Sequence, residues 1–293
     1  MQPQPPANTA PPDRPEPPAV WAAGPTQPVA SAAGSSPWAW RGFVLATVAR
    51  DFRMRYTGSL LGGAWALLGP LAQIVIYTVV FSQLMHARLP AVEGGWAYSI
   101  HICGGILVWG LFNEILQRGQ NLFTDHADLI RKVRFPHLTL LLAIVLTAGL
   151  HALIMLAMLL GFLALVGLLP GLGLLALLPP LLLTALLAAG GGLLLGLLHV
   201  HVRDVGAMLG VALQFLFWAT PIVYPLQILP AWAAQWVAWN PLTPLVGAVQ
   251  AALLGTPGPG WPALAAVALL ALLLGALALA QHRRLGGELA DHL

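Results

Sequence analysis

The sequence predicts an all-α polytopic membrane protein, and three observations support this prediction. Of the 293 residues, 58% are hydrophobic and 8% are charged, and the mean hydropathy is +0.81. A soluble domain carries about 25% charged residues. Between residues 135 and 280, Arg203 and Asp204 are the only formally charged residues. The apolar residues also fall into stretches of roughly 20, the length that crosses a bilayer as a helix.

Six apolar stretches are expected to span the membrane. They cover residues 60–84, 98–122, 137–169, 171–198, 205–224 and 261–280. Pro179 and Pro180 should kink the fourth stretch or mark its true start, because proline interrupts the hydrogen bonds of a helix interior. The small residues Gly190, Gly191 and Gly192 would let neighbouring helices approach closely.

The basic residues indicate the orientation of the chain. Arginine and lysine gather on one side of the predicted spans, and the other side holds Arg88 alone. The first group consists of Arg41, Arg50, Arg53, Arg55, Arg131, Lys132, Arg134, Arg203, Arg283 and Arg284. Because basic residues stay on the cytoplasmic side of a membrane, both termini are predicted to be cytoplasmic.

Two segments precede the predicted transmembrane domain, which covers residues 59–293. Residues 1–37 are rich in proline and are expected to form a disordered cytoplasmic tail. Residues 38–58 are predicted to form an amphipathic helix on the membrane surface. Trp40, Val44, Val48 and Phe52 are spaced four apart and share one helical face. The alternative for this segment is a short basic linker beside the membrane.

Residues 226–254 are predicted to form two short re-entrant helices between the fifth and sixth spans. Trp232, Trp236 and Trp239 fall on one helical face of the first piece. The second piece is expected to begin with Thr243 as N-cap and to stop at Gly255. Each piece is too short to cross a bilayer, and tryptophans favour the membrane interface. The alternative is a single span broken by prolines.

Glu114 is the acidic residue inside the second predicted span. An intramembrane carboxylate usually faces a polar interior or a partner, so Glu114 is a functional candidate. Its expected partners are Arg118, at i+4 on the same helix, and Asn113. The alternative role is that of a paired structural glutamate. His151 lies alone in the third span, and no other span contains an acid, which argues against a proton antiporter.

Aromatic residues in the spans are candidate contacts for a substrate in a channel. The candidates are Tyr77, Phe81, Trp109, Phe215, Trp218 and Tyr224. Aromatic side chains stack on the apolar faces of sugar rings, and a channel lined this way would let a polymer slide. The alternative is that these residues face lipid or pack between helices.

The sequence predicts no catalytic residue, no metal site and no cofactor in this chain. Lys132 is the single lysine and follows Arg131, so the GxxxxGK[ST] loop that cradles ATP phosphates is absent. The lone Cys103 excludes an internal disulfide and a multi-cysteine metal site. The charges are grouped in loops rather than in a nucleic-acid-binding patch. Any ATP-driven transport would therefore need a separate ATPase.

The segment 124–135 is the main loop on the basic side. Thr124 is expected to cap a short helix, with Asp125 and Asp128 near its positive end. Arg131, Lys132 and Arg134 follow near its negative end. Taken alone, this pattern is also that of a solvated loop that carries the orientation signal.

The stretch RDFRMRYTGSLLGGAWALLGP, residues 50–70, resembles the membrane subunit of polysaccharide-exporting ABC transporters, within the ABC-2 group. The matching residues are Arg50, Asp51, Arg55, Tyr56, Gly58, Ser59, Gly62, Trp65 and Pro70. LIRKVRFP, residues 129–136, resembles a coupling helix of that family, and Asn240, Pro241 and Leu242 resemble its NPL element. The resemblance extends over residues 38–254.

The resemblance implies the permease subunit of an ATP-driven exporter of lipid-linked polysaccharide in the bacterial cytoplasmic membrane. The family's permease is a homodimer with a pore between protomers, and two copies of an ATPase subunit bind ATP and Mg. The residues implied in ATPase coupling are Arg50, Arg53, Asp128, Leu129, Ile130, Arg131 and Lys132. Those implied in an outer gate are Trp232, Trp236, Trp239, Asn240 and Pro241.

Two other functions are compatible with the residues. An ABC-2 exporter of small hydrophobic molecules would have the same fold. A neighbouring ATPase gene would not distinguish it from a polysaccharide exporter, because both need an ATPase. A polytopic glycosyl or acyl transferase is the alternative of a different class, and it would need no ATPase partner.

Overall fold

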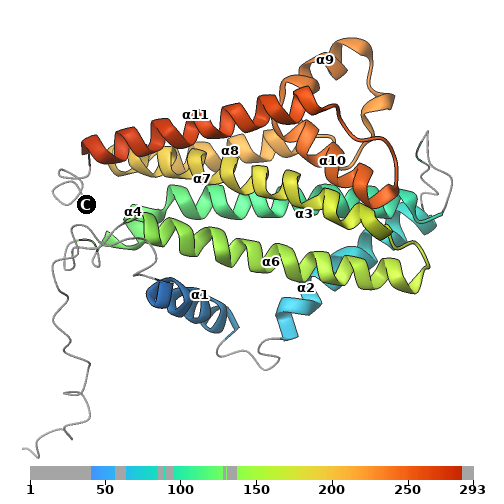
Figure 1. Ribbon diagram of the computed structural model, residues 1–293, viewed down its shortest axis with the longest axis horizontal. Helices are drawn as coiled ribbons and strands as arrows, with labels where there is room; N and C mark the ends of the chain where they lie inside the picture. The colour runs from blue at the N-terminus through green and yellow to red at the C-terminus, as the bar shows by residue number, and fades with distance from the viewer. Residues whose placement is uncertain are drawn as a thin grey trace, which may run out of the picture. The chain divides into compact units, whose positions relative to one another are not determined.

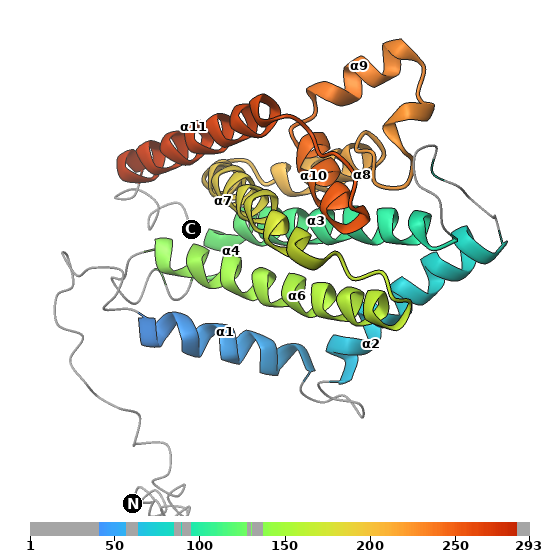
Figure 2. The same ribbon diagram turned by 45° about the vertical axis from the view of Figure 1, so that its right-hand side comes forward.

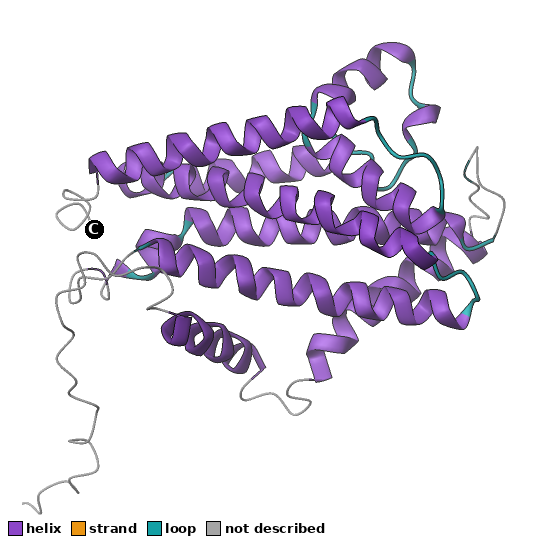
Figure 3. Ribbon diagram, in the orientation of Figure 1, coloured by secondary structure: helices purple, strands orange, loops and turns teal. Residues whose placement is uncertain are grey.

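The computed structural model describes residues 41–56, 64–84, 89, 95–127, 130 and 137–285 of the chain. The elements of this described part are helices (Figure 3). The predicted tail at residues 1–37 lies outside the described part. The helices are α1 Arg41–Tyr56, α2 Trp65–Tyr77, the π-helix η4 Thr78–Leu84, α3 Ala97–Gln120, α4 Leu122–Asp125, α6 Leu138–Leu165, the 3-10 helix η5 Gly171–Leu177, α7 Leu178–His201, α8 Val205–Trp218, the 3-10 turn η6 Leu226–Ile228, α9 Ala231–Trp239, α10 Leu242–Leu254 and α11 Trp261–Leu285.

Four helices in the described part are long and apolar enough to cross a membrane. They are α3, α6, the helix Gly173–His201 that contains α7, and α11. The pair α9 and α10 is bent by 98° and adds at most one span. α8 has 14 residues, so the predicted span 205–224 is shorter than expected. The predicted span 60–84 corresponds to α2 and η4, but its first residues lie outside the described part.

Helix α3 lies at the centre of the bundle, between α6 and α7 (Figures 1 and 2). In its most apolar window, 78% of the residues are buried, whereas 17% are buried in α11. α10 packs on the first half of α3, and α11 packs on α7 from the outside. The core is therefore built around α3, and most of the α11 surface is exposed.

Helix α7 begins with a proline pair and approaches its neighbours through glycines. Pro179 and Pro180 occupy the first turn of α7, which confirms the prediction that they mark its true start. A Cβ at Gly192 would lie 3.2 Å from the Gly119 Cα on α3. A Cβ at Gly190 would lie 2.9 Å from the Gly275 backbone nitrogen on α11. The absence of side chains lets α7 touch both helices backbone to backbone.

The chain turns sharply between α8 and α10, and Asn240 fixes this turn. Its side-chain Nδ2 donates to the Ala219 carbonyl at 3.1 Å and to Thr220 Oγ1 at 2.8 Å. Its Oδ1 accepts the Leu242 N–H at 2.9 Å and so caps α10. The expected N-cap, Thr243, instead lies inside α10 and donates its hydroxyl to the Val237 carbonyl at 2.6 Å.

Asn240 is the better cap because its side chain carries both a donor and an acceptor, and the fold uses both. The end of α10 matches the prediction. Gly255 has a φ of 67°, a left-handed conformation that ends a helix and that glycine adopts without steric cost.

Replacing Gly196 by alanine should destabilise the bundle. The new Cβ would lie 2.7 Å from the Gly119 carbonyl oxygen, which belongs to the backbone and cannot rotate away. Overpacking of this kind costs about 1–3 kcal/mol. Thermal unfolding of the detergent-solubilised chain measures the loss. The control is Gly161→Ala on α6, where nothing lies within 4 Å of the new Cβ. Equal melting temperatures of the two variants would contradict the close contact.

Candidate functional site

An apolar cluster joins several helices at the C-terminal end of α3. It consists of Leu122, Phe123, Ile130, Leu140, Ile144, Leu193, Leu197 and Ala278, and it is called the Phe123 cluster below. Phe43 of α1 packs against it. The Phe123 cluster therefore connects α1, the segment after α3, and the ends of α6, α7 and α11.

The structure corrects one expectation for the segment 124–135 and places one of its residues. Ile130 is 8% exposed and packs inside the Phe123 cluster, and its role in ATPase coupling stays a prediction. Thr124 is not the cap of a helix; it is the third residue of α4, and its hydroxyl donates to the Asn121 carbonyl at 3.0 Å. Leu129 lies outside the described residues, and its contact with a partner stays a prediction.

His137, directly before α6, lies beside the Phe123 cluster. Its ring stands edge-on to that of His282, with 5.3 Å between the centroids, and 6.1 Å from the ring of Phe123. Burial, and secondarily the neighbouring His282, lower the pKa of His137 below its ordinary value of 6.5. His137 is therefore neutral at pH 7, which avoids burying a charge beside apolar side chains.

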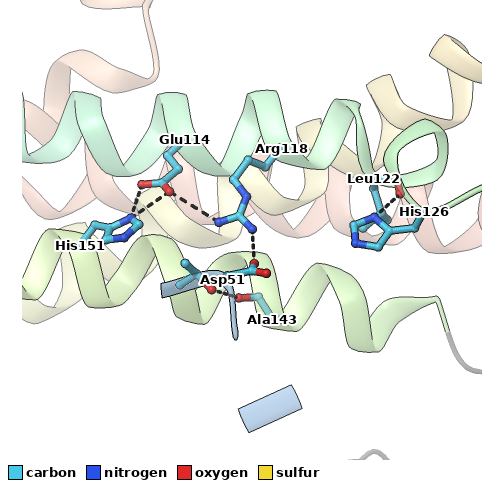
Figure 4. Close-up of polar contacts among 8 residues, drawn as sticks. Asp51, Glu114, Arg118, Leu122, His126, Ala143 and His151 are labelled. Carbon is cyan, nitrogen blue, oxygen red and sulfur yellow. Dashed lines mark hydrogen bonds and ion pairs between the residues drawn. The ribbon is translucent and has the colours of Figure 1, made fainter. Parts of the chain in front are cut away.

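A chain of ionisable side chains links α1, α3 and α6, and Figure 4 shows it. It consists of Asp51 on α1, Glu114 and Arg118 on α3, and His151 on α6, and it is called the Arg118 network below. Arg118 Nη2 donates to Asp51 Oδ2 at 2.5 Å, and Arg118 Nη1 lies 3.6 Å from Glu114 Oε1. His151 Nδ1 lies 2.9 Å from both carboxylate oxygens of Glu114.

The side chains of the Arg118 network are partly shielded. The exposed fractions are 33% for Arg118, 21% for Asp51, 19% for Glu114 and 17% for His151. Ionised groups in or near a bilayer are costly unless they are paired. Arg118 extends from a membrane helix, so the Asp51 carboxylate both stabilises its charge and holds α1 against the bundle.

Apolar contacts support the same docking of α1. Val44 and Thr47 are 3% and 6% exposed, on the face of α1 that packs against α6. The ring of Phe52 lies 6.2 Å from that of His151. Part of the apolar face predicted for residues 38–58 thus packs against other helices of the chain. Its placement on a membrane surface stays a prediction.

Sequence reasoning found part of the Arg118 network. The predicted contact between Glu114 and Arg118 is present, but the second expected partner, Asn113, accepts a hydrogen bond from Gln117 Nε2 at 2.8 Å. The contact of His151 with Glu114 was not predicted. Both carboxylate contacts that were missed join residues 37 and 67 positions apart, so no local spacing could reveal them.

The other residues implied in coupling are only partly described. Arg50 and Arg53 lie on α1 with exposed side chains. The remaining ones, Asp128, Leu129, Arg131 and Lys132, lie outside the described residues. Their role in coupling stays a prediction.

The first predicted channel aromatics, Tyr77 and Phe81, form one group where α2 continues into η4. The rings of Tyr77 and Phe81 are 6.3 Å apart, and Phe81 stacks on Tyr98 at 5.5 Å. The Tyr98 hydroxyl donates to the Val223 carbonyl at 2.7 Å. Tyr98 was missed because it lies at the very start of α3, where periodicity gives no signal.

The remaining aromatics form a second group around α8. Trp109 of α3 stands edge-on to Phe217 at 5.3 Å, and Phe217 contacts Trp218 at 5.4 Å. Phe215 and Trp218 are 74% and 61% exposed. The Tyr224 hydroxyl donates to the Trp218 carbonyl at 2.7 Å. Phe215 and Trp218 are thus available to a pore or to a second chain, whereas Trp109 packs between helices.

The three tryptophans of α9 point away from the bundle. Trp232, Trp236 and Trp239 are 69%, 76% and 86% exposed. Asn240 and Pro241 follow them at the bend that leads into α10. Among the described residues, no group of three or more His, Cys, Asp and Glu side chains has a metal-binding arrangement.

Residues 43–254 match the family described as ABC-2 type transporter, and this match covers most of the chain. The chain belongs to this family. The matched part contains the Arg118 network, the Phe123 cluster up to Leu197, and the bent pair α9–α10. The long apolar helices of the chain agree with its membership of a membrane-spanning transporter family.

Several transport proteins resemble this chain in sequence. It is 28% identical to the O-antigen export system permease protein RfbA of Myxococcus xanthus, over 72% of this chain and 80% of that protein. It is 25% identical to RfbA of Klebsiella pneumoniae, over 67% and 74% of the two chains. It is also 25% identical to the polysialic acid transport protein KpsM of Escherichia coli, over 70% and 78%.

The contact between Asp51 and Arg118 should contribute measurably to stability. A double-mutant cycle of Asp51→Ala and Arg118→Ala is expected to give a coupling energy of about 0.5–3 kcal/mol, as for residues in one ionic network. Chemical unfolding in detergent measures the four variants.

The matched control cycle pairs Arg50→Ala with Arg118→Ala, because Arg50 precedes Asp51 but is exposed. That cycle should be additive within experimental error. A cycle of Asp51 and Arg118 that is equally additive would show that the contact does not hold α1.

Proposed function

We propose that this chain is the permease subunit of an ATP-driven exporter that moves a lipid-linked polysaccharide, such as an O-antigen, across the bacterial cytoplasmic membrane. The observation that carries the proposal is the similarity to O-antigen and polysialic acid transport proteins over about 70% of the chain. Two of the three relatives compared are named for O-antigen export, so O-antigen is the substrate class that we favour.

The proposed assembly contains two copies of this chain with the pore between them. Both termini lie in the cytoplasm, and six segments span the membrane, with α2–η4 and α8 among them. A separate ATPase subunit, also in two copies, binds ATP and Mg. This division of labour is supported by the lack of a phosphate-binding GxxxxGK[ST] loop in the 293 residues.

ATPase motion is proposed to enter this chain through α1 and the segment 124–135. Both elements reach the Phe123 cluster, α1 through Phe43 and the segment through Ile130. α1 is also held to α3 and α6 by the Arg118 network. A displacement of either element would therefore first change the Phe123 cluster or the Arg118 network, and through them the helices that these contact.

The proposed pore is bounded by α8, and its outer gate by residues 226–254. Met208, Val211, Phe215 and Trp218 form an exposed apolar row on α8. Such a row suits the contact between two copies or the wall of a pore that sugar rings slide along. Trp232, Trp236 and Trp239 anchor the re-entrant helices at the membrane interface.

The substrate is tested by removing this chain from cells. Loss of the permease should leave lipid-linked glycan on the cytoplasmic side of the membrane and deplete the polysaccharide on the cell surface. Staining of protease-free spheroplasts for glycan before permeabilisation detects the outer glycan, and staining after permeabilisation also detects the inner glycan. The control is the same strain complemented by the wild-type chain. If glycan export is unchanged and only sensitivity to small hydrophobic drugs rises, the substrate class is wrong.

Leu129→Asp should abolish binding of the ATPase subunit while leaving membrane insertion intact, because a charge cannot enter an apolar cleft. Co-purification of the ATPase with a tagged permease measures the effect. Leu168→Asp is the control, since it places the same charge at an exposed leucine in the turn after α6. Equal amounts of ATPase on both variants would exclude segment 124–135 as the docking element.

A further inference from the structure

A pocket of about 610 Å³ lies beneath the bent pair α9–α10, away from the Arg118 network. Its walls come from α10, from the loops on either side of the pair, from α9 and from the start of α3 and α11. The α10 wall is formed by Thr243, Pro244, Gly247, Gln250, Ala251 and Leu254. The facing residues include His101, Pro221, Leu226 and Ala263.

The buried polar side chains of this pocket contact other parts of the protein. Gln250 is 6% exposed, and its Nε2 donates to the His101 carbonyl at 3.1 Å and to the Pro221 carbonyl at 3.2 Å. Thr243 donates to the Val237 carbonyl. None of the buried polar side-chain atoms that lack a partner in the described part lines the pocket. The other polar residues of the lining are Gln227, which is exposed, and Thr256, which is half-buried. Most of the remaining lining is apolar, so no buried polar group of the pocket requires a polar ligand.

Exposed tryptophans on the bounding helices indicate the depth of the pocket in the membrane. Trp232, Trp236 and Trp239 lie on α9, which contributes Ala238 to the wall, and Trp261 precedes Ala263 on α11. Trp261 is 81% exposed. Tryptophans collect at the level of the lipid headgroups. The pocket therefore lies where lipid acyl chains begin.

We propose that this pocket binds one acyl chain of a bilayer phospholipid. A hydrocarbon chain satisfies an apolar lining without leaving a polar group unpaired, and membrane lipid is present at this depth at high concentration. Pockets of this size accept small ligands or parts of larger ones. The proposal requires only that the chain lies in a membrane, and it is independent of the exported substrate.

A bound chain would brace the bent pair in the observed arrangement. Its contacts would reach α10 through Gly247, the loop after α8 through Pro221, and α11 through Ala263. These three elements meet at the pocket, where Asn240 ties the bend to the end of α8 and Gln250 ties α10 to the loop after α8. Lipid in the pocket would add apolar contacts to these few side-chain hydrogen bonds.

The test is photocrosslinking of the full chain in nanodiscs that contain a phosphatidylethanolamine with a diazirine in one acyl chain. After irradiation, mass spectrometry should find the label on peptides from residues 238–263. Gly247→Phe should abolish this labelling, because a Cβ at Gly247 meets nothing within 4 Å and the ring would occupy the pocket. Ala238→Leu narrows the same pocket from α9 and should reduce the labelling.

The matched control is Gly161→Phe on α6, which also meets open space but lies outside the pocket. Its labelling at residues 238–263 should equal that of the wild type, and melting temperatures identify any variant that does not fold. Persistent labelling in both folded pocket variants would overturn the proposal, and so would no labelling in the wild type. A parallel arm uses a diazirine polyprenyl phosphate; labelling by this probe alone would reject phospholipid as the occupant.

Discussion

The pairing of Arg118 determines how α1 is attached to the rest of the protein. A guanidinium extending from a membrane helix cannot lose its proton, and its charge is costly in lipid unless an acid lies close. Glu114, one turn away on α3, is 3.6 Å from it, whereas Asp51 on α1 is 2.5 Å from it. Arg118 is thus closer to Asp51, which is distant in sequence, than to Glu114 on its own helix. Pairing of the Arg118 charge therefore requires that α1 packs against the bundle.

Helix α3 carries this constraint to the opposite end of the bundle. Arg118 lies near its C-terminal end, and His101, near its N-terminal end, is about 25 Å away at 1.5 Å per residue. The His101 carbonyl accepts a hydrogen bond from Gln250 of α10. Between these points α3 is buried among α6, α7 and α10 and contacts α7 through glycine backbones. A helix packed so closely moves as one body rather than bending.

The sequence was informative where a feature depends on neighbours along the chain. The contact at i+4 between Glu114 and Arg118, the proline start of α7 and the glycine end of α10 all follow from local helix geometry. Some of the features it missed depend on distant partners. The contact of His151 with Glu114 could not be predicted from spacing, because the two residues are 37 positions apart. The cap of α10 was missed for a different reason: Asn240 is only two residues from the Leu242 N–H that it accepts, but Thr243 followed by Pro244 also fits the start of a helix.

The two ends of α3 are held by interactions of different kinds, which indicates where motion enters. The hydrogen bonds of Gln250 to backbone carbonyls are buried, and breaking them would leave unpaired polar groups at a cost of about 1–3 kcal/mol each. The Arg118 network is partly exposed, so water or lipid headgroups can replace one partner while another forms. Asp51 can therefore exchange contacts as α1 shifts, whereas α10 follows α3. A push on α1 is expected to change the Arg118 network first and to reach α10 as a movement of the whole central helix.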